Sequence, residues 1–229
     1  MPIPPLVSFF RFSGLSDLVE ERRSRLQASQ DVHQFFRDVE DESQWIREHV
    51  VVAASPDVGS SLTSVQNLQK RHNAFEMELA NHELRLNDIN DHANELVSAK
   101  NFASDAIVQQ NRELQASWKN LLAHTKGRKM KLEQSLDAQK YYFEATEADV
   151  WMNEKAGIAS NQDYGKDEDT AEKYLQKHRT LAVDVEAYAK EVSRLEEMAQ
   201  SFIPADHFDA MAIGARQASE IGRVLRIKD

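Results

Sequence analysis

Apolar side chains recur at steps of three and four residues along most of the chain, which is the pattern of helices that pack as a coiled coil. The first stripe begins near Leu62 and the second near Ala171. A third stripe begins at Ile107. The first comprises Val65, Leu68, His72, Phe75, Leu79, His82, Leu86, Ile89, Ala93 and Leu96. The second comprises Tyr174, His178, Leu181, Val185, Tyr188, Val192, Leu195, Ala199 and Phe202. The third comprises Asn111, Leu114, Trp118, Leu121, Thr125, Arg128 and Leu132.

The chain repeats itself at a fixed offset. The stretch "FFRDVEDESQWIRE" around Trp45 has the same form as "YYFEATEADVWMNE" around Trp151, which lies 106 positions later. At that offset His72 also falls on His178, and no gap is needed between the two copies. Such self-similarity indicates that each copy is one supersecondary unit, and the stripes predict three helices in it.

The join between the two copies is predicted to be helical. Proline occurs at positions 2, 4, 5, 56 and 204 only, so none interrupts the segment from Ser104 to about Lys155. Gly127 weakens a helix there by only about 1 kcal/mol relative to Ala. The third helix of one copy should therefore continue into the first helix of the next, over roughly 75 Å at 1.5 Å per residue. The residues expected in this joining helix are Gly127, Leu132 and Leu136.

The predicted fold is all-α, with tandem antiparallel three-helix bundles joined by a continuous helix. The loops "SPDVGSS" and "NQDYGKDED" precede helix starts, and Ser104 and Asp206 are candidate caps for the third helices. The second copy should be truncated in its third helix, since Val224 stands where the first copy has Trp118. We expect four segments: a disordered or unrelated leader at 1–14, the end of a preceding repeat helix at 15–28, one repeat at 29–134 and the second at 135–229.

Large aromatic side chains suit the space between three packed helices, which explains the tryptophans among acidic neighbours. Truncating Trp45 or Trp118 should cost about 3–5 kcal/mol. His72 and His178 lie on the stripe, so we interpret them as packed or rim-exposed structural histidines, with a pH-sensitive or partner-contact role as the alternative. The predicted structural core is Phe36, Trp45, Leu68, His72, Phe75, Leu79, Leu86, Trp118, Tyr142, Trp151, His178, Leu181, Val185 and Leu195.

Composition excludes several classes of function. The net charge of −10 and the pI near 5.3 argue against nucleic-acid binding, which needs a basic face. No run approaches the roughly 18 apolar residues of a membrane span. Cysteine is absent, which removes thiolate metal sites and fits a cytoplasmic location. No histidine completes the Glu-x-x-His motif of di-iron bundles, and no phosphate loop or hydrolase motif occurs. We therefore expect no enzyme activity, no catalytic residues, no metal and no cofactor.

The aromatic pair followed by Trp, the "DVG" and "DYG" turns, and the segments "LQKRHNAFEMEL" and "LQKHRTL" together resemble the spectrin-repeat family over residues 15 to about 225. The segments "AQKYYFEATEADVWMNEK", "KDEDTAEKYLQKH" and "VEAYAKEVSRLEEMAQ" are most similar to a β-spectrin chain, in the later half of its rod.

The resemblance implies a structural protein of the actin-linked membrane skeleton, at the cell cortex beneath the plasma membrane. It implies an elastic rod spacer, with α-spectrin as an antiparallel lateral partner. Actin and ankyrin would be bound only through other parts of a parent chain. The alternative is an adaptor or scaffold segment, similar to α-actinin, dystrophin, plakin or Trio-like proteins, that docks a specific protein. The charge runs "EERRSR" and "KGRKMK" are candidate docking sites, although solvated faces are the simpler interpretation.

Overall fold

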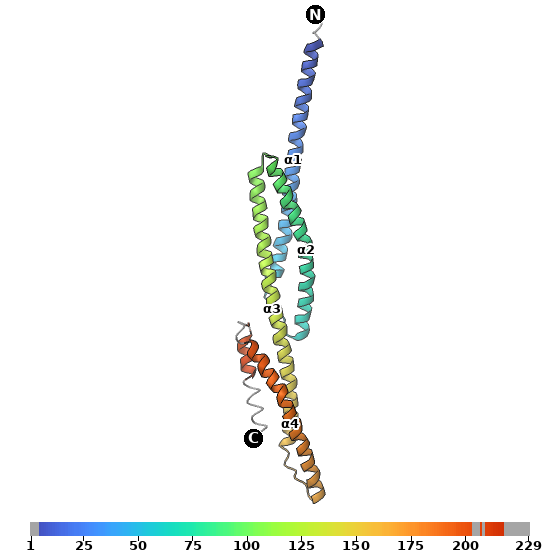
Figure 1. The fold of residues 1–229 in the computed structure, drawn as a ribbon, viewed down its shortest axis with the longest axis vertical. Helices are drawn as coiled ribbons and strands as arrows, with labels where there is room; N and C mark the ends of the chain where they lie inside the picture. Colours follow the sequence, from blue (N-terminus) through green and yellow to red (C-terminus); the bar gives the residue numbers. More distant parts are fainter. Residues whose placement is uncertain (1–4, 203–206, 208, 218–229) are drawn as a thin grey trace. The chain divides into compact units, whose positions relative to one another are not determined.

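The computed structural model describes the backbone of residues 5–202, 207 and 209–217, and the side chains from residue 14 onward within these ranges. Helix α1 spans Pro5–Ala53, α2 spans Leu62–Ser98, α3 spans Ser104–Ala159 and α4 spans Glu168–Phe202 (Figure 1). Residues 210–217 form a further short helical stretch, and no strand occurs among the described residues. The predicted all-α class is confirmed.

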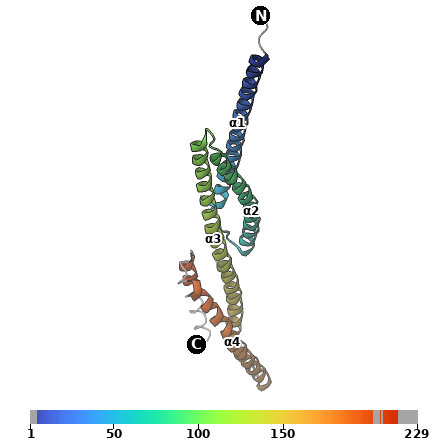
Figure 2. The same cartoon turned by 45° about the horizontal axis from the view of Figure 1, so that its top comes forward.

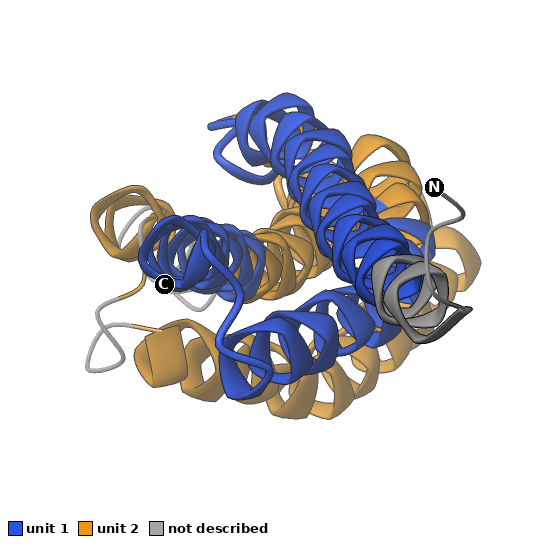
Figure 3. Cartoon of the chain, turned by 90° about the horizontal axis from the view of Figure 1, so that it is seen from above, with its two compact units in different colours: residues 1–56, 72–128 blue, residues 57–71, 129–229 orange. Residues whose placement is uncertain are grey.

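Two compact units divide the chain (Figure 3). Unit 1 comprises residues 1–56 and 72–128, and unit 2 comprises residues 57–71 and 129–229. The part of the loop from Asp57 onward and the first turns of α2 thus group with unit 2. One contact within that unit is a hydrogen bond of 2.8 Å from Ser135 Oγ to the carbonyl oxygen of Val58.

Unit 1 is a three-helix bundle, and Figures 1 and 2 show α2 beside the first part of α3. Its buried core draws on all three helices, because apolar positions at three- and four-residue steps place one stripe of each helix inward. The core comprises Val32, Phe35, Val39, Ile46, Ala53, Phe75, Leu79, Leu86, Ile89, Ala93, Leu96, Ile107, Leu114, Trp118 and Leu121.

Unit 2 has a core of its own, contributed by α3, α4 and the short helical stretch. It comprises Ala138, Tyr141, Ala145, Ala148, Met152, Leu195, Ala199 and Ile213. Asp206 and Val224 lie outside the described residues, so the cap and the truncation predicted from them stay predictions.

The two loops that precede α2 and α4 share one construction. Gly59 has φ 79° and Gly165 has φ 90°, a left-handed conformation that glycine adopts without the strain of a side chain. In both loops the glycine amide hydrogen bonds to the carboxylate of the aspartate two residues earlier, Asp57 or Asp163. The "DVG" and "DYG" motifs are therefore turns whose aspartate side chain orients the backbone toward the next helix.

Each of these helices starts with a reciprocal capping arrangement. Ser61 Oγ accepts from the amide of Ser64, and Ser64 Oγ accepts from the amide of Ser61. At the offset of 106 residues, Asp167 Oδ1 accepts from the amide of Thr170, and Thr170 Oγ1 accepts from the amide of Asp167. Two otherwise unpaired helix-start amides are satisfied in each case, which fixes where α2 and α4 begin.

Candidate functional site

The joining helix is the feature that the sequence singled out between the two copies. Helix α3 runs without interruption through Gly127, Leu132 and Leu136. Leu132 is buried, whereas Gly127 and Leu136 are half-buried. The part of the fold prediction that joins the bundles by a continuous helix is confirmed.

Two side chains of α3 bind backbone carbonyls of the loop after α1. Arg128 Nη1 donates to the carbonyl oxygen of Ser55 at 2.5 Å, within unit 1. Ser135 Oγ donates to that of Val58, within unit 2. Arg128 lies in the run "KGRKMK", but its guanidinium already serves this loop, and Lys126, Lys129 and Lys131 are exposed.

In unit 1 Trp45 is half-buried and lies between two imidazole rings. Its ring stacks on His49 at a centroid distance of 3.9 Å and on His82 at 3.5 Å. His82 Nδ1 lies 2.5 Å from Oε1 of Glu42, whose side chain is only 1% exposed. Arg85 Nε lies 3.4 Å from the other carboxylate oxygen of Glu42. A buried carboxylate requires such partners, since an unpaired charge in a core is strongly destabilising.

In unit 2 the positions 106 residues later carry different side chains. Trp151 stacks on Tyr188 at 3.8 Å, and the ammonium group of Lys155 lies 5.5 Å from the Trp151 ring centroid. Ala148 stands where unit 1 has Glu42. The sequence stripes identified His82 and Tyr188 as inward positions but did not include His49. They gave no signal that Glu42 pairs with His82, because neither residue belongs to a metal or catalytic motif.

The structure places the predicted core residues at three levels of burial. The buried residues are His72, Phe75, Leu79, Leu86, Trp118, Leu181 and Leu195. The half-buried residues are Phe36, Trp45, Leu68, Tyr142, Trp151 and Val185. In each aromatic pair the first member is fully buried instead, namely Phe35 and Tyr141.

His178 is exposed, so its assignment to the core was wrong. Its counterpart His72 is 5% exposed in unit 1, where Trp118 and Leu121 of α3 close the core. The positions 106 residues after Trp118 and Leu121 are Val224 and Ile227, which lie outside the described residues. The described part of the third helical stretch in unit 2 extends to Gln217.

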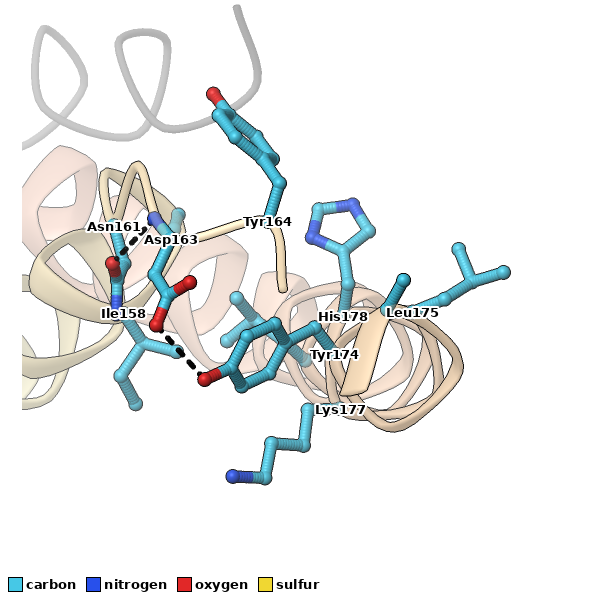
Figure 4. A pocket seen from close by; sticks show the side chains of 11 residues that line it. Ile158, Asn161, Asp163, Tyr164, Tyr174, Leu175, Lys177 and His178 are labelled. Atoms are coloured by element: carbon cyan, nitrogen blue, oxygen red, sulfur yellow. Dashed lines mark hydrogen bonds between the residues drawn. The ribbon is translucent and has the colours of Figure 1, made fainter. Parts of the chain in front are cut away.

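His178 instead lines a pocket of about 550 Å³ in unit 2 (Figure 4). Among the lining side chains Tyr174 Oη donates to Asp163 Oδ2 at 2.9 Å (Figure 4), and this bond raises the pKa of Tyr174. Tyr164 is exposed on the loop before α4. The pocket is lined by both apolar and polar side chains, and no group of three or more potential metal ligands occurs among the described residues.

In both units a loop side chain hydrogen bonds the start of the third helix to the first helix in the same way. Asn101 Nδ2 donates to the carbonyl oxygen of Ala28 at 3.1 Å, and Asn101 Oδ1 accepts from the amide of Ala103 at 3.0 Å. In unit 2 His207 takes the place of Asn101: its Nε2 lies 2.9 Å from the carbonyl oxygen of Gln134, and its Nδ1 accepts from the amide of Asp209 at 3.1 Å. Sequence reasoning missed both side chains, because they lie in loops outside the stripes.

Further contacts attach this stretch to α3 in unit 2. Tyr142 Oη donates to Asp209 Oδ2 at 2.6 Å, and burial together with this bond raises the pKa of Tyr142. Arg216 forms an ion pair with Asp149.

The N-terminal part of α1 carries no core in the described structure. Residues 14–27 are exposed, including Leu15, Leu18, Val19 and Leu26. Within "EERRSR", Glu21 pairs with Arg25 and Glu20 with Arg23 along the same helix. The backbone of residues 5–14 is helical and continuous with this segment, so the proposed leader is not separated from it by a break in α1.

No helix in the described part of the chain combines the length and apolar character that crossing a membrane requires.

These features define a class: an all-helical tandem-repeat protein in which one helix contributes buried residues to two successive bundles. The comparison with protein families agrees, because the spectrin-repeat model matches residues 30–134 and 136–219. The chain therefore belongs to the spectrin-repeat family, a family of non-enzymatic structural repeats.

Similar proteins are β-spectrin chains, as the sequence resemblance predicted. The chain is 35% identical to "Spectrin beta chain" of Drosophila melanogaster over 91% of this chain and 9% of that protein. It is 28% identical to human "Spectrin beta chain, non-erythrocytic 4" over 93% of this chain and 8% of that protein. It is 30% identical to human "Spectrin beta chain, non-erythrocytic 5" over 82% of this chain and 5% of that protein. The chain thus spans less than a tenth of the length of these relatives.

Proposed function

We propose that this chain is an elastic spacer segment of a spectrin-type rod in the cytoskeleton at the cell cortex. The observation that carries the proposal is the participation of α3 in two cores: Trp118 and Leu121 are buried in one, and Ala138 and Tyr141 in the other. Load applied along such a helix acts on both bundles, and burial of its side chains resists extension until a bundle opens.

The proposed segmentation is one repeat at 29–134 and a second at 135–229, truncated in its third helix. Residues 15–28 end a preceding repeat helix, and 1–14 form a leader. The family matches at 30–134 and 136–219 support the two repeat boundaries. The likeness to β-spectrin chains supports a position in such a rod, and we place it in the later half.

Pulling the full chain from both ends with optical tweezers tests the spacer function. We expect reversible unfolding events that lengthen the chain in steps of one or two bundles, with refolding when the force is lowered. A chain that extends smoothly, without a cooperative step, would contradict the proposal. A Gly127→Pro variant provides the control, because proline within α3 breaks the helix between the two cores and should change how the two events are coupled.

We further propose that the segment pairs side by side and antiparallel with α-spectrin repeats. The likeness to β-spectrin chains supports this partner. The exposed charged side chains of the helices, on a chain with net charge −10, support recognition by charge complementarity.

Sedimentation velocity of the full chain, alone and mixed with purified α-spectrin repeats, tests the pairing. We expect a monomer that forms a one-to-one heterocomplex, and weaker association at high salt because surface charges are screened. Repeats from a distant region of the α chain serve as the matched control. A monomer that ignores both α-spectrin fragments would refute the pairing, and a tight homodimer would favour an α-actinin-like segment.

A further inference from the structure

Asn101 and His207 make equivalent hydrogen bonds at positions 106 residues apart. Each donates to a backbone carbonyl of the first helix of its bundle, at Ala28 or Gln134, which are themselves 106 residues apart. Each also accepts from the backbone amide two residues later. The two side chains therefore tie the start of the third helix to the first helix in the same geometry.

The difference between the two side chains is chemical. An amide presents a permanent donor and a permanent acceptor, whereas an imidazole does so only in its neutral form. A carbonyl oxygen can only accept, so Nε2 of His207 carries the proton that faces Gln134. A backbone amide can only donate, so Nδ1 of His207 must be unprotonated to accept from Asp209.

Protonation at Nδ1 would convert this acceptor into a donor that faces the amide of Asp209. His207 is 7% exposed, so solvent gives the displaced groups little compensation. The Phe202 ring packs against the imidazole at a centroid distance of 5.1 Å. Charged and titratable groups on the elements that meet there include the Asp209 carboxylate and the Tyr142 hydroxyl of α3, which are hydrogen bonded to each other. They also include Arg216, which forms an ion pair with Asp149 of α3.

We propose that His207 is a proton-sensitive latch for the third helix of the second repeat. With Nδ1 unprotonated, it holds the stretch 209–217 against α3; with Nδ1 protonated, it releases the amide of Asp209 and the stretch opens more often. Asn101 makes the latch of the first repeat insensitive to pH. The inference concerns the stability of one bundle and does not depend on the proposed partner or on the spacer function.

Hydrogen exchange measured by mass spectrometry on the full chain tests the latch. Protection is compared at pH 8 and pH 5.5, across the range in which imidazoles take up a proton, after correction for the intrinsic exchange rate. We expect protection of residues 209–217 to fall roughly two- to tenfold at the lower pH, as loss of one hydrogen bond implies. The matched variant His207→Asn should keep its protection at both pH values.

The reciprocal variant Asn101→His provides an independent test in unit 1. In this variant, protection from hydrogen exchange at the start of α3 should fall on acidification, whereas in the parent it should not. The parent and both variants share all the other histidines, so the contributions of those residues cancel in the comparison. The proposal would be overturned if the parent and His207→Asn showed equal pH dependence. It would also be overturned if the parent were better protected at pH 5.5, which would mean that the Asp209 carboxylate stabilises the imidazolium. If His207→Asn does not fold, an Asn101→His chain without the added drop would overturn it as well.

Discussion

Replacing Gly127 by alanine should stabilise the joining helix. A β-carbon built at Gly127 meets no atom within 4 Å, so the substitution introduces no clash. Glycine within a helix is less favourable than alanine by about 1 kcal/mol, because it loses more backbone entropy on folding. We expect that gain in the free energy of unfolding, which corresponds to a rise of roughly 4–8 °C in Tm for a bundle of about 100 residues.

The same substitution at Gly59 should have the opposite sign. Gly59 has φ 79°, where a β-carbon would lie 2.8 Å from Ser64 Oγ and 2.9 Å from the backbone nitrogen of Val65. The left-handed conformation alone costs a residue with a side chain about 1–2 kcal/mol, and the contact with the backbone adds to that. Gly59→Ala is therefore the matched control, since it makes the same chemical change outside the helix interior.

Urea unfolding followed by far-ultraviolet circular dichroism measures both variants against the parent chain. An increased midpoint for Gly127→Ala at an unchanged slope, with a decreased midpoint for Gly59→Ala, is the expected result. If Gly127→Ala left the midpoint unchanged or lowered it, the segment around Gly127 would not be an ordinary helix interior in solution. The continuous joining helix would then be wrong as a description of the free protein.

Four further substitutions address the cores and the helix starts. Trp118→Ala should lower the free energy of unfolding by about 3–5 kcal/mol in urea titrations, because a 5% exposed indole leaves a cavity, and Trp45→Ala should cost less since its ring is half-buried. Ser61→Ala removes the acceptor of the Ser64 amide and should cost about 1 kcal/mol by the same assay. Hydrogen bonds from Thr170 lower the pKa of Asp167 below its ordinary value of 3.8. The charged carboxylate therefore stabilises the fold at pH values above 3.8, and this stabilisation is lost as the pH falls through the lowered pKa. Thermal melts of the parent and Asp167→Asn should therefore differ less at pH 2 than at pH 6, and an unchanged difference would contradict the assignment.

The sequence predicted the helices and the joining segment well because a heptad stripe and the absence of proline act locally. A stripe also predicts which face of a helix points inward, and Phe75, Leu79 and Leu86 are buried accordingly. The sequence prediction did not extend it to the first helix of each copy, where it also distinguishes the two members of the aromatic pair. Phe35 is buried because it continues the three- and four-residue steps of Val32 and Val39. Phe36, in contrast, lies one position off that stripe and is half-buried.

Contacts between distant segments were beyond sequence reasoning. His178 belongs to the stripe of α4 but is exposed, because the spacing along one helix does not show which of its positions a neighbouring helix covers. The pairing of Glu42 with His82 joins residues on two helices, and nothing in the spacing of either helix indicates that a carboxylate belongs in this core.

The two repeats therefore share the hydrogen bonds that fix their helix starts, and they differ in the side chains of their cores. The capping pairs and the ties of the third helix occupy matching positions because the backbone amides and carbonyls that they satisfy recur in every bundle of this geometry. The core positions are less constrained, since any set of side chains with the right volume and satisfied polar atoms can fill them. Glu42 and His82 in unit 1 accordingly correspond to Ala148 and Tyr188 in unit 2. Because the differing groups are the titratable ones, two bundles with one architecture should respond differently to pH. A segment built from them would open at one repeat before the other.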